Sequence, residues 1–149
     1  MNKKLPDFTL STTQGEVKLS EVETPYLVVY FYPKDNTPGC TLEGQDFAKH
    51  FKKFSKLGAS VYGVSRDSLK SHDKFKCQFE FPFALISDPE EKLCQHFEVM
   101  KMKKLYGKEY LGVDRSTFLF KGGKLIKEWR NVKVTGHVEE VLEAIGDAA

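Results

Sequence analysis

The residues of this 149-residue chain that are best suited to chemistry are its three cysteines. Cys40 follows Thr37-Pro38-Gly39, Cys77 stands in a lysine-rich stretch, and Cys94 lies beside apolar residues. Their odd number and the lack of a Cys-x-x-Cys pair argue against a structural disulfide framework. The four histidines are scattered, without the spacing of a zinc-binding pair, so we expect no metal site. Thiol chemistry at one cysteine, or three inert cysteines, are the interpretations that remain.

The segment from Tyr30 to Glu43 places Cys40 where a strand is expected to turn into a helix. Unpaired backbone N–H groups and the positive end of the helix dipole favour an anion in the first helical turn. Thiols placed there commonly have a pKa of about 3.5–7.5 instead of about 8.5, and the thiolate is the nucleophilic form. Cys40 is therefore the candidate nucleophile. The alternative is a small residue that only packs where strand turns into helix.

Two neighbours of Cys40 could shape its site. Thr37, three residues earlier, could direct its hydroxyl group into the same pocket. Pro33 has no N–H group and a fixed φ angle, so it would stiffen the loop and could shield one side of the thiolate. All three residues follow the carboxyl end of a predicted strand, the place where open α/β sheets usually build their sites.

The rest of the chain alternates between strand and helix patterns. Runs rich in Val, Ile, Leu, Phe and Tyr predict five strands, over residues 26–32, 59–65, 83–87, 116–120 and 125–130. The first of these is continuously apolar, as expected of a central strand that is covered on both faces. Apolar stripes predict helices marked by Phe47, Phe51, Phe54 and Leu57, by Leu69, Phe75 and Phe79, by Leu93 and Phe97, and by Val138, Val141, Leu142 and Ile145.

The connections predict how the strands pair. Helical crossovers favour parallel pairing of the first three strands, whereas the Gly122-Gly123 turn forces the last two into an antiparallel hairpin. A further small hairpin is expected around Phe8–Leu10 and Val17. The prediction is one domain over residues 1–149, an α/β thioredoxin-like fold with a mixed central β-sheet, flanking helices and an N-terminal β-hairpin extension.

Composition and charge narrow the class of protein. The chain is 40% hydrophobic and 30% charged, a globular profile, and its formal charge of +2 gives no bulk argument for nucleic-acid or membrane binding. The longest apolar run is too short to span a bilayer, and Met1–Asp7 lacks the apolar core of a secretory signal. We expect a soluble, cytoplasmic protein. The lysines from Lys101 to Lys108 are expected on a solvated loop, and His50 and His137 on helix surfaces.

Pro33-x-x-x-Thr37-x-x-Cys40 matches the P-x-x-x-T-x-x-C signature of the peroxiredoxins. The wider stretch from Tyr30 to Glu43 resembles their bacterioferritin-comigratory, or PrxQ, subfamily. The resemblance covers nearly the whole chain, through Pro6-Asp7-Phe8, Ser71-His72-Asp73, Phe81-Pro82-Phe83, Ser87-Asp88 and the stretch from Gly112 to Leu119. It implies a thiol-dependent peroxidase that reduces hydrogen peroxide and organic hydroperoxides with no metal or organic cofactor.

The resemblance also implies a role for single residues. Cys40 corresponds to the peroxidatic cysteine, which attacks the O–O bond and becomes a sulfenic acid. Thr37 corresponds to the hydroxyl that binds peroxide and thiolate, Pro33 to the shielding proline, and Arg115 to the family's arginine. A guanidinium suits this task because it is planar, permanently charged and able to hold sulfur and oxygen together. From the residues alone, Arg115 could equally form a surface ion pair with an acidic residue nearby in the sequence.

The sulfenic acid must be reduced again, and the subfamily commonly uses a second, resolving cysteine. Many members carry it five residues after the first, where this chain has Gln45. Others carry it in the following helix, at the position of Lys76, one residue before Cys77. We expect a Cys40–Cys77 disulfide that thioredoxin or a similar dithiol opens, with an external thiol or Cys94 as alternatives.

Helix geometry bears on these alternatives. Cys77 falls opposite the apolar stripe of its helix, so it should be accessible, whereas Cys94 has the pattern of a small buried hydrophobe. A disulfide needs Cα atoms within about 7 Å, so we expect the Cys40 turn, the Cys77 helix or both to unfold locally in each cycle. Resemblance also suggests a monomer. The competing functions are a thioredoxin-like disulfide oxidoreductase and a non-catalytic binding module of the same fold.

Overall fold

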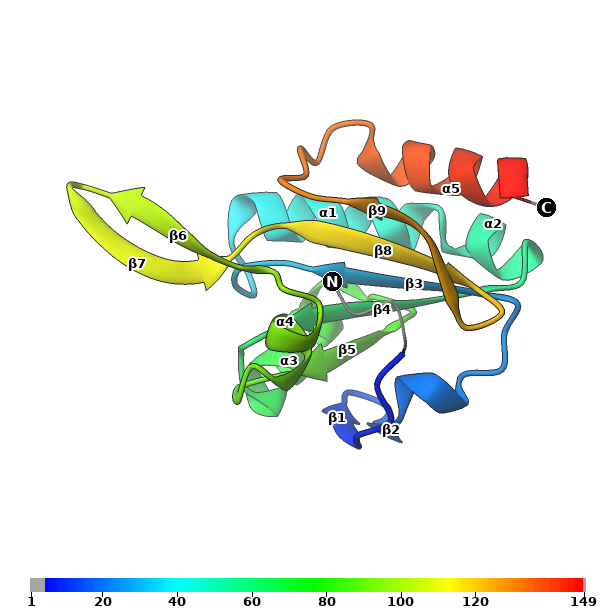
Figure 1. Cartoon of the computed structure of the whole chain (residues 1–149), viewed down its shortest axis with the longest axis horizontal. Coiled ribbons are helices and arrows are strands. Elements are labelled where there is room, and N and C mark those ends of the chain that lie inside the picture. The colour runs from blue at the N-terminus through cyan, green and yellow to red at the C-terminus, as the bar shows by residue number, and fades with distance from the viewer. Residues whose placement is uncertain (1–4, 149) are drawn as a thin grey trace.

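The computed structural model describes residues 5–148, and a seven-stranded mixed sheet forms their centre (Figure 1). The strands of this sheet lie in the order β2-β1-β5-β4-β3-β8-β9. Their bounds are β1 Leu10–Thr12, β2 Gly15–Val17, β3 Tyr26–Phe31, β4 Ala59–Ser65, β5 Ala84–Ser87, β8 Ser116–Lys121 and β9 Lys124–Trp129. All five strands predicted from the apolar runs are present, and so is the N-terminal hairpin of β1 and β2.

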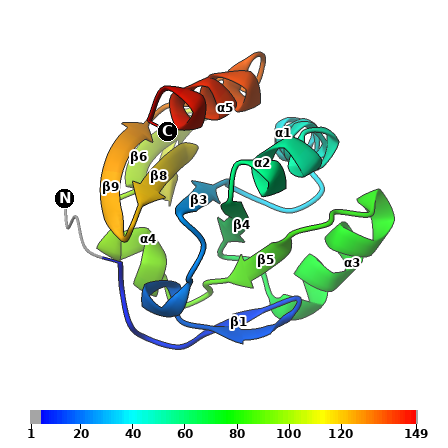
Figure 2. The same ribbon diagram turned by 90° about the vertical axis from the view of Figure 1, so that its right-hand side faces the viewer.

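Helices cover both faces of the sheet, as predicted (Figure 2). Their bounds are η1 Leu19–Glu21 (a 3-10 turn), α1 Pro38–Lys49, α2 Phe51–Lys56, α3 Leu69–Phe79, α4 Lys92–His96 and α5 His137–Ala148. Side chains of α1, α2, α3 and α5 share one apolar core, and those of α4 and η1 belong to the other. The helix that carries Cys94 therefore lies on the face of the sheet opposite the helices that carry Cys40 and Cys77.

The pairing of the strands confirms the predicted topology. β3 pairs in parallel with β4, and β4 with β5, while β8 runs antiparallel to both β3 and β9. The tight turn between β8 and β9 has φ angles of 57° at Gly122 and 81° at Gly123, the positive values that primed hairpin turns require.

β3 is the central strand, and it is buried on both faces. Tyr26, Val28 and Tyr30 point into the core under α1 and α5, and the alternating residues from Leu27 to Phe31 point into the core under α4. Two-sided burial explains why the run reads as continuously apolar in the sequence. It also gives a rigid base to the loop that leaves β3 toward Cys40.

The first predicted helix is in fact two helices. The stripe from Phe47 to Leu57 continues without a gap, but His50 has φ −100° and ψ 6° and separates α1 from α2. Both the backbone N–H and the ring Nδ1 of His50 lie within hydrogen-bond distance of the carbonyl oxygen of Asp46, at 3.2 and 2.9 Å. Helical periodicity survives such a break, so the pattern could not reveal it.

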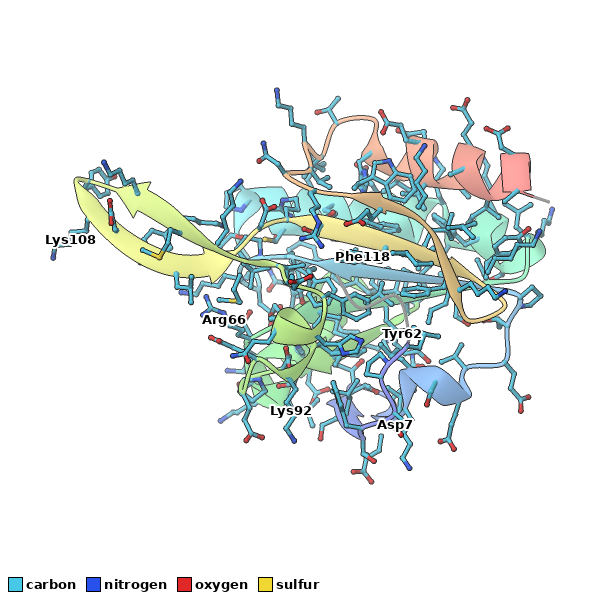
Figure 3. The ribbon with its side chains drawn as sticks, viewed as in Figure 1. Asp7, Tyr62, Arg66, Lys92, Lys108 and Phe118 are labelled. Atoms are coloured by element: carbon cyan, nitrogen blue, oxygen red, sulfur yellow. The ribbon has the colours of Figure 1, made fainter. Side chains whose placement is uncertain are left out.

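The prediction of a loop around these lysines is wrong, because the residues form a second, two-stranded sheet. β6 (Met100–Leu105) and β7 (Lys108–Val113) pair in an antiparallel hairpin around Tyr106 and Gly107, whose φ angles are 53° and 77°. The hairpin projects from the body of the molecule beside the start of α1 (Figure 1), and Lys108 lies at its tip (Figure 3). Most of the hairpin is exposed on both faces, so its sequence lacks the alternation of apolar and polar residues that marks a half-buried strand.

Within residues 5–148, no helix combines the length and apolar character needed to cross a bilayer. The first four residues of the segment tested for a secretory signal lie outside this range.

Candidate active site

Cys40 lies in the first turn of α1, as predicted. The helix begins at Pro38, directly after Thr37, which has the extended backbone of an N-cap residue (φ −95°, ψ 156°). Cys40 is its third residue, and only 2% of it is exposed. The thiol is thus held below the surface, at the carboxyl end of the central strand, where free helix N–H groups favour a negative charge.

Arg115 directly precedes β8 and contacts Cys40, although the two residues are 75 positions apart in the sequence. Phe31 and Ser116 are directly paired across β3 and β8, so Arg115 lies beside the end of β3. Its Nη2 group is 3.3 Å from Sγ of Cys40. The surface ion pair considered from the sequence is wrong, because the carboxylate that Arg115 binds belongs to Glu43, deep in the site.

Glu43 is the acidic residue that the sequence analysis missed. Its Oε1 accepts a hydrogen bond of 2.6 Å from Nη1 of Arg115, and its side chain is fully buried. Burial raises the pKa of Glu43 to about 7, although Arg115 opposes the shift. The sequence feature that could have identified Glu43 is its spacing from Cys40: it lies three residues later, so both side chains project from one face of α1. Glu43 therefore fixes the guanidinium that faces the sulfur.

A glycine makes room for this arrangement. A Cβ atom built on Gly39 would lie 3.2 Å from Nη2 of Arg115, closer than ordinary van der Waals contact. Gly39 thus allows the guanidinium to lie against the first turn of α1. Burial alone would lower the pKa of Arg115, but the charges of Glu43 and Cys40 raise it above its ordinary value.

Thr37 and Pro33 lie in the loop that leads to Cys40. The hydroxyl of Thr37 donates to the carbonyl of Lys34 at 2.9 Å, and its own carbonyl accepts from the N–H of Thr41. The structure therefore brings Thr37 to the N-terminus of α1 but directs its hydroxyl at the loop backbone. Pro33 is half-buried in the same loop.

The other two thiols differ sharply from each other. Cys77 is exposed on α3, and Cys94 is fully buried at the start of α4, as the helix patterns predicted. Burial, and then the carboxylate of Asp88, raise the pKa of the Cys94 thiol well above its usual range. All three cysteines are free thiols.

Comparison with known proteins decides the family. A family model described as the AhpC/TSA family matches residues 1–128. The Peroxiredoxin Bcp of Bacillus subtilis is 51% identical over 149 residues, which cover 99% of this chain and 95% of that protein. The Peroxiredoxin Bcp of Xanthomonas campestris is 54% identical over 141 residues, 93% of this chain and 88% of that protein. The chain belongs to the AhpC/TSA family, as a peroxiredoxin of the Bcp/PrxQ group.

Solved structures agree with this assignment. A cysteine-to-serine mutant of Xanthomonas campestris Peroxiredoxin Q superposes with a TM-score of 0.92, at 48% identity over 97% of this chain and 94% of that one. The Bacterioferritin Comigratory Protein of the same organism, studied for its alkyl peroxide reduction activity, gives 0.91 at 47% identity, over 97% and 92% of the two chains. The thioredoxin-like fold and the thiol-dependent peroxidase activity expected from the sequence are confirmed.

Within the described part of this peroxiredoxin, one group of side chains has the spacing of a metal site. The ligand atoms of Asp35, Asp67 and His72 lie within 4.8 Å of one another. They are already bound to protein groups: Asp67 accepts from the N–H of Asp35 and the hydroxyl of Ser65, and Asp35 contacts His72 at 2.7 Å. The group is therefore a hydrogen-bond network between two loops and α3, and it gives no support to metal binding.

His137 lies behind the active site of the peroxiredoxin, and the prediction that it is exposed is wrong. Its Nε2 is 2.7 Å from the hydroxyl of Thr117 on β8, and only 3% of it is exposed. Burial, and then the charge of Arg115, lower the pKa of His137 to about 4. The first turn of α5 packs against the sheet at this point, so the histidine stays neutral and adds no competing charge to the site.

Proposed function

We propose that Cys40 is the peroxidatic nucleophile of this peroxiredoxin. The observation that carries the proposal is the 3.3 Å contact between its sulfur and Nη2 of Arg115, inside a site that is almost closed to bulk water. A guanidinium at this distance favours the thiolate. It can also donate to the peroxide oxygen on which negative charge develops, and fixed donors of this kind stabilise a transition state without reorganising.

The reaction follows from this arrangement. The Cys40 thiolate attacks one peroxide oxygen, the O–O bond breaks, and the other oxygen leaves and takes up a proton to become water or an alcohol. The sulfur is oxidised to sulfenic acid while the peroxide is reduced by the same two electrons. Pro33 shields the thiolate, and the hydroxyl of Thr37 turns from the Lys34 carbonyl to bind the peroxide. Arg115, held by Glu43, completes the site.

Cys77 is the resolving cysteine in this proposal. It is exposed, and its helix α3 packs through Phe75 into the same core as Cys40. Cys94 belongs to the core on the opposite face of the sheet, which argues against it as partner. The thiol of Cys77 attacks the sulfenic acid, the S–S bond forms, and water leaves.

The substrates and the reductant follow from the family. We propose that the enzyme accepts hydrogen peroxide and organic hydroperoxides, in line with the alkyl peroxide reduction studied in the related bacterioferritin comigratory protein. A thioredoxin-type dithiol then opens the Cys40–Cys77 disulfide by thiol–disulfide exchange, because the cycle needs two electrons from outside the chain.

The same proposal places the enzyme in the cytoplasm as a monomer of one domain, residues 1–149. Its cysteines support this placement, since they are free thiols of odd number, as expected for a reducing compartment. Light scattering on the reduced and the oxidised enzyme tests the monomer, and a single thermal transition by calorimetry tests the single domain.

Three serine variants test the chemistry. We expect Cys40→Ser to lose peroxide consumption completely. Cys77→Ser should still reduce one equivalent of peroxide per chain but lose turnover with thioredoxin, because its sulfenic acid has no internal partner. Cys94→Ser, the matched control, should stay close to the wild type. Mass spectrometry after one equivalent of peroxide should find a 40–77 disulfide in the wild type.

The outcomes separate the competing functions. Undiminished turnover by Cys40→Ser would contradict the assignment of the nucleophile, and a 40–94 link, or none, would contradict Cys77 as resolving cysteine. A disulfide oxidoreductase would reduce a protein disulfide at a rate that does not depend on peroxide. A binding module would consume no peroxide in any variant.

A further inference from the structure

One buried carboxyl group ties together the two segments that carry Cys40 and Cys77. Asp35 lies in the loop between β3 and α1, and its Oδ2 accepts a 2.7 Å hydrogen bond from the hydroxyl of Ser71. The same oxygen lies 2.7 Å from Nδ1 of His72. Ser71 and His72 are in the first turn of α3, the helix of Cys77. We call Asp35, Ser71 and His72 the loop–helix clamp.

The clamp is anchored on both sides. The other oxygen of Asp35 accepts a 2.6 Å hydrogen bond from the hydroxyl of Tyr32, which follows β3. The backbone N–H of Asp35 donates to the carboxylate of Asp67. On the helix side, Nε2 of His72 lies 2.8 Å from the carbonyl oxygen of Ile86 in β5. A carbonyl only accepts, so this contact is a hydrogen bond donated by Nε2. The contacts of Nε2 and Nδ1 together hold His72 between β5 and Asp35, in a place where the histidine is fully buried.

The resolving step requires these segments to move. Cys40 is buried, Cys77 is exposed on a continuous helix, and both are free thiols. A disulfide demands Cα atoms within about 7 Å and Cβ atoms that face each other. Either the loop and first turn of α1 must leave their place, or α3 must unwind. Asp35 lies three residues before Pro38 and binds the first turn of α3, so the clamp resists both movements.

We propose that the loop–helix clamp is a positioning device that sets how fast the Cys40 sulfenic acid is resolved. The inference rests on the proposed roles of Cys40 and Cys77. While the clamp is closed, the loop holds Cys40 against Arg115 and the site reacts with peroxide. When it opens, Cys40 can reach Cys77, and the disulfide forms with loss of water.

The clamp also decides the fate of the sulfenic acid. As long as the site stays closed, the sulfur of the sulfenic acid can attack a second peroxide; the O–O bond breaks, the sulfur gains an oxygen and becomes a sulfinic acid, and the rest of the peroxide leaves as water or alcohol. A tight clamp thus favours over-oxidation at high peroxide, and a loose clamp favours the disulfide. Ser71 and His72 do not touch the reacting atoms, so their effect on the first step should be small.

The test uses full-length enzyme with Ser71→Ala, which removes one hydrogen bond from a half-buried position. After one equivalent of peroxide, acid quenching and mass spectrometry should show disulfide formation faster by about three- to tenfold, the range that one hydrogen bond allows. The sulfinic fraction at high peroxide should fall by a similar factor. The rate of the first peroxide step should change by less than about twofold.

Ser68→Ala is the matched control. Ser68 is the N-cap of α3, and its hydroxyl accepts from the N–H of Ser71, but it has no bond to Asp35 among the contacts described. We expect its resolving rate to stay close to the wild type. If Ser68→Ala accelerates resolution as much as Ser71→Ala, then the stability of α3 alone sets the rate, and the clamp is refuted. An unchanged or slower rate in Ser71→Ala refutes it equally.

Hydrogen exchange supplies a readout that does not depend on activity. Amides of residues 34–42 should exchange faster in Ser71→Ala than in Ser68→Ala, because only the first variant frees the catalytic loop. Equal exchange in that segment would overturn the proposal. The wild-type sample tests the underlying chemistry separately, since absence of a 40–77 disulfide there would refute the role of Cys77 before any variant is compared.

Discussion

Two buried thiols occupy the same helical position on opposite faces of the sheet. Cys40 is the third residue of α1 and Cys94 the third residue of α4, and they are 2% and 0% exposed. Their neighbours have opposite charges. Cys40 faces the guanidinium of Arg115 at 3.3 Å, whereas the backbone N–H of Cys94 donates to the carboxylate of Asp88 at 2.9 Å.

The difference shows what a helix start contributes to a thiol. In α4, Asp88 already accepts from the N–H groups of Leu93 and Cys94, so the donors of that first turn are used. In α1, the N-cap Thr37 makes no side-chain bond to the helix, which leaves these donors for an anion. Position and burial are therefore insufficient; a nucleophilic thiol needs free donors and a cation.

The largest expected effect is the contrast in reactivity between these two thiols. In Cys77→Ser, which removes the proposed resolving thiol, a short exposure to stoichiometric peroxide with a sulfenic-acid trap should label Cys40 at least about 10³-fold more than Cys94. The reason is that Cys94 stays protonated and is reached only when the fold opens, a state populated at about 10⁻³ or less. Peptide mass spectrometry measures both labels. Comparable labelling of Cys94 would remove the distinction.

The next effect concerns the cation. Arg115→Ala should lower the second-order rate constant for peroxide by about 10²–10³, the usual effect of removing one fixed donor from a developing negative charge. Stopped-flow kinetics measures it. Arg66→Lys is a suitable control, because Arg66 binds Glu91 instead of the active site. A loss of less than tenfold in Arg115→Ala would mean that the helix donors suffice without the guanidinium.

Glu43 should make the stability of the protein depend on pH. Its pKa is about 7 in the fold and lies near 4.5 when the chain is unfolded, so the folded state holds a proton that the unfolded state has lost. Stability therefore falls as pH rises from about 4.5 through 7, by about 3 kcal/mol in total. Urea unfolding at pH 5, 6, 7 and 8 should show this decrease in the free energy of unfolding for the wild type but not for Glu43→Gln. Parallel curves would show that Glu43 ionises normally.

The smallest effect belongs to a second cation near Cys40. The Lys103 ammonium donates to the carbonyl of Val113 at 2.6 Å, two residues before Arg115. Burial lowers the pKa of Lys103 below its ordinary value, and the charge of Arg115 adds to this shift while the carboxylate of Asp114 opposes it. Because this charge is more distant than Arg115, Lys103→Met should slow the peroxide step by only about two- to threefold. Lys104→Met, on the other face of the hairpin, should have no effect; equal losses would point to the hairpin fold instead of the charge.

Features carried by local pattern were predictable from the sequence. The run at Tyr26–Phe31 showed a strand buried on both faces, and the helical spacing around Cys77 and Cys94 showed which thiol is exposed. The start of α1 at Cys40 followed from the change between strand and helix patterns. Each of these depends on residues within one or two turns of the position concerned.

What depends on distant pairing was not predictable from local patterns. Only the family resemblance pointed to Arg115, which reaches Cys40 because β3 and β8 pair in a register that no local pattern encodes. In the sequence, Glu43 has the appearance of an ordinary polar helix residue, and only the tertiary fold places the guanidinium of Arg115 beside it. The helix pattern predicted that His137 is exposed, but the first turn of α5 packs against the sheet and buries it beside Thr117. Partners chosen by the tertiary fold thus account for the residues that the sequence analysis missed or misplaced.

Gly39 leaves no room for a side chain between the first turn of α1 and Arg115. A single methyl group there would meet Nη2 of Arg115 at 3.2 Å and would have to displace it by a few tenths of an ångström. Such a change adds no charge and removes no hydrogen-bonding group, yet it would wedge the cation away from the sulfur. If Arg115 acts as proposed, the rate of peroxide reduction depends on the absence of a Cβ atom at residue 39, and Gly39→Ala measures how finely the cation must be placed.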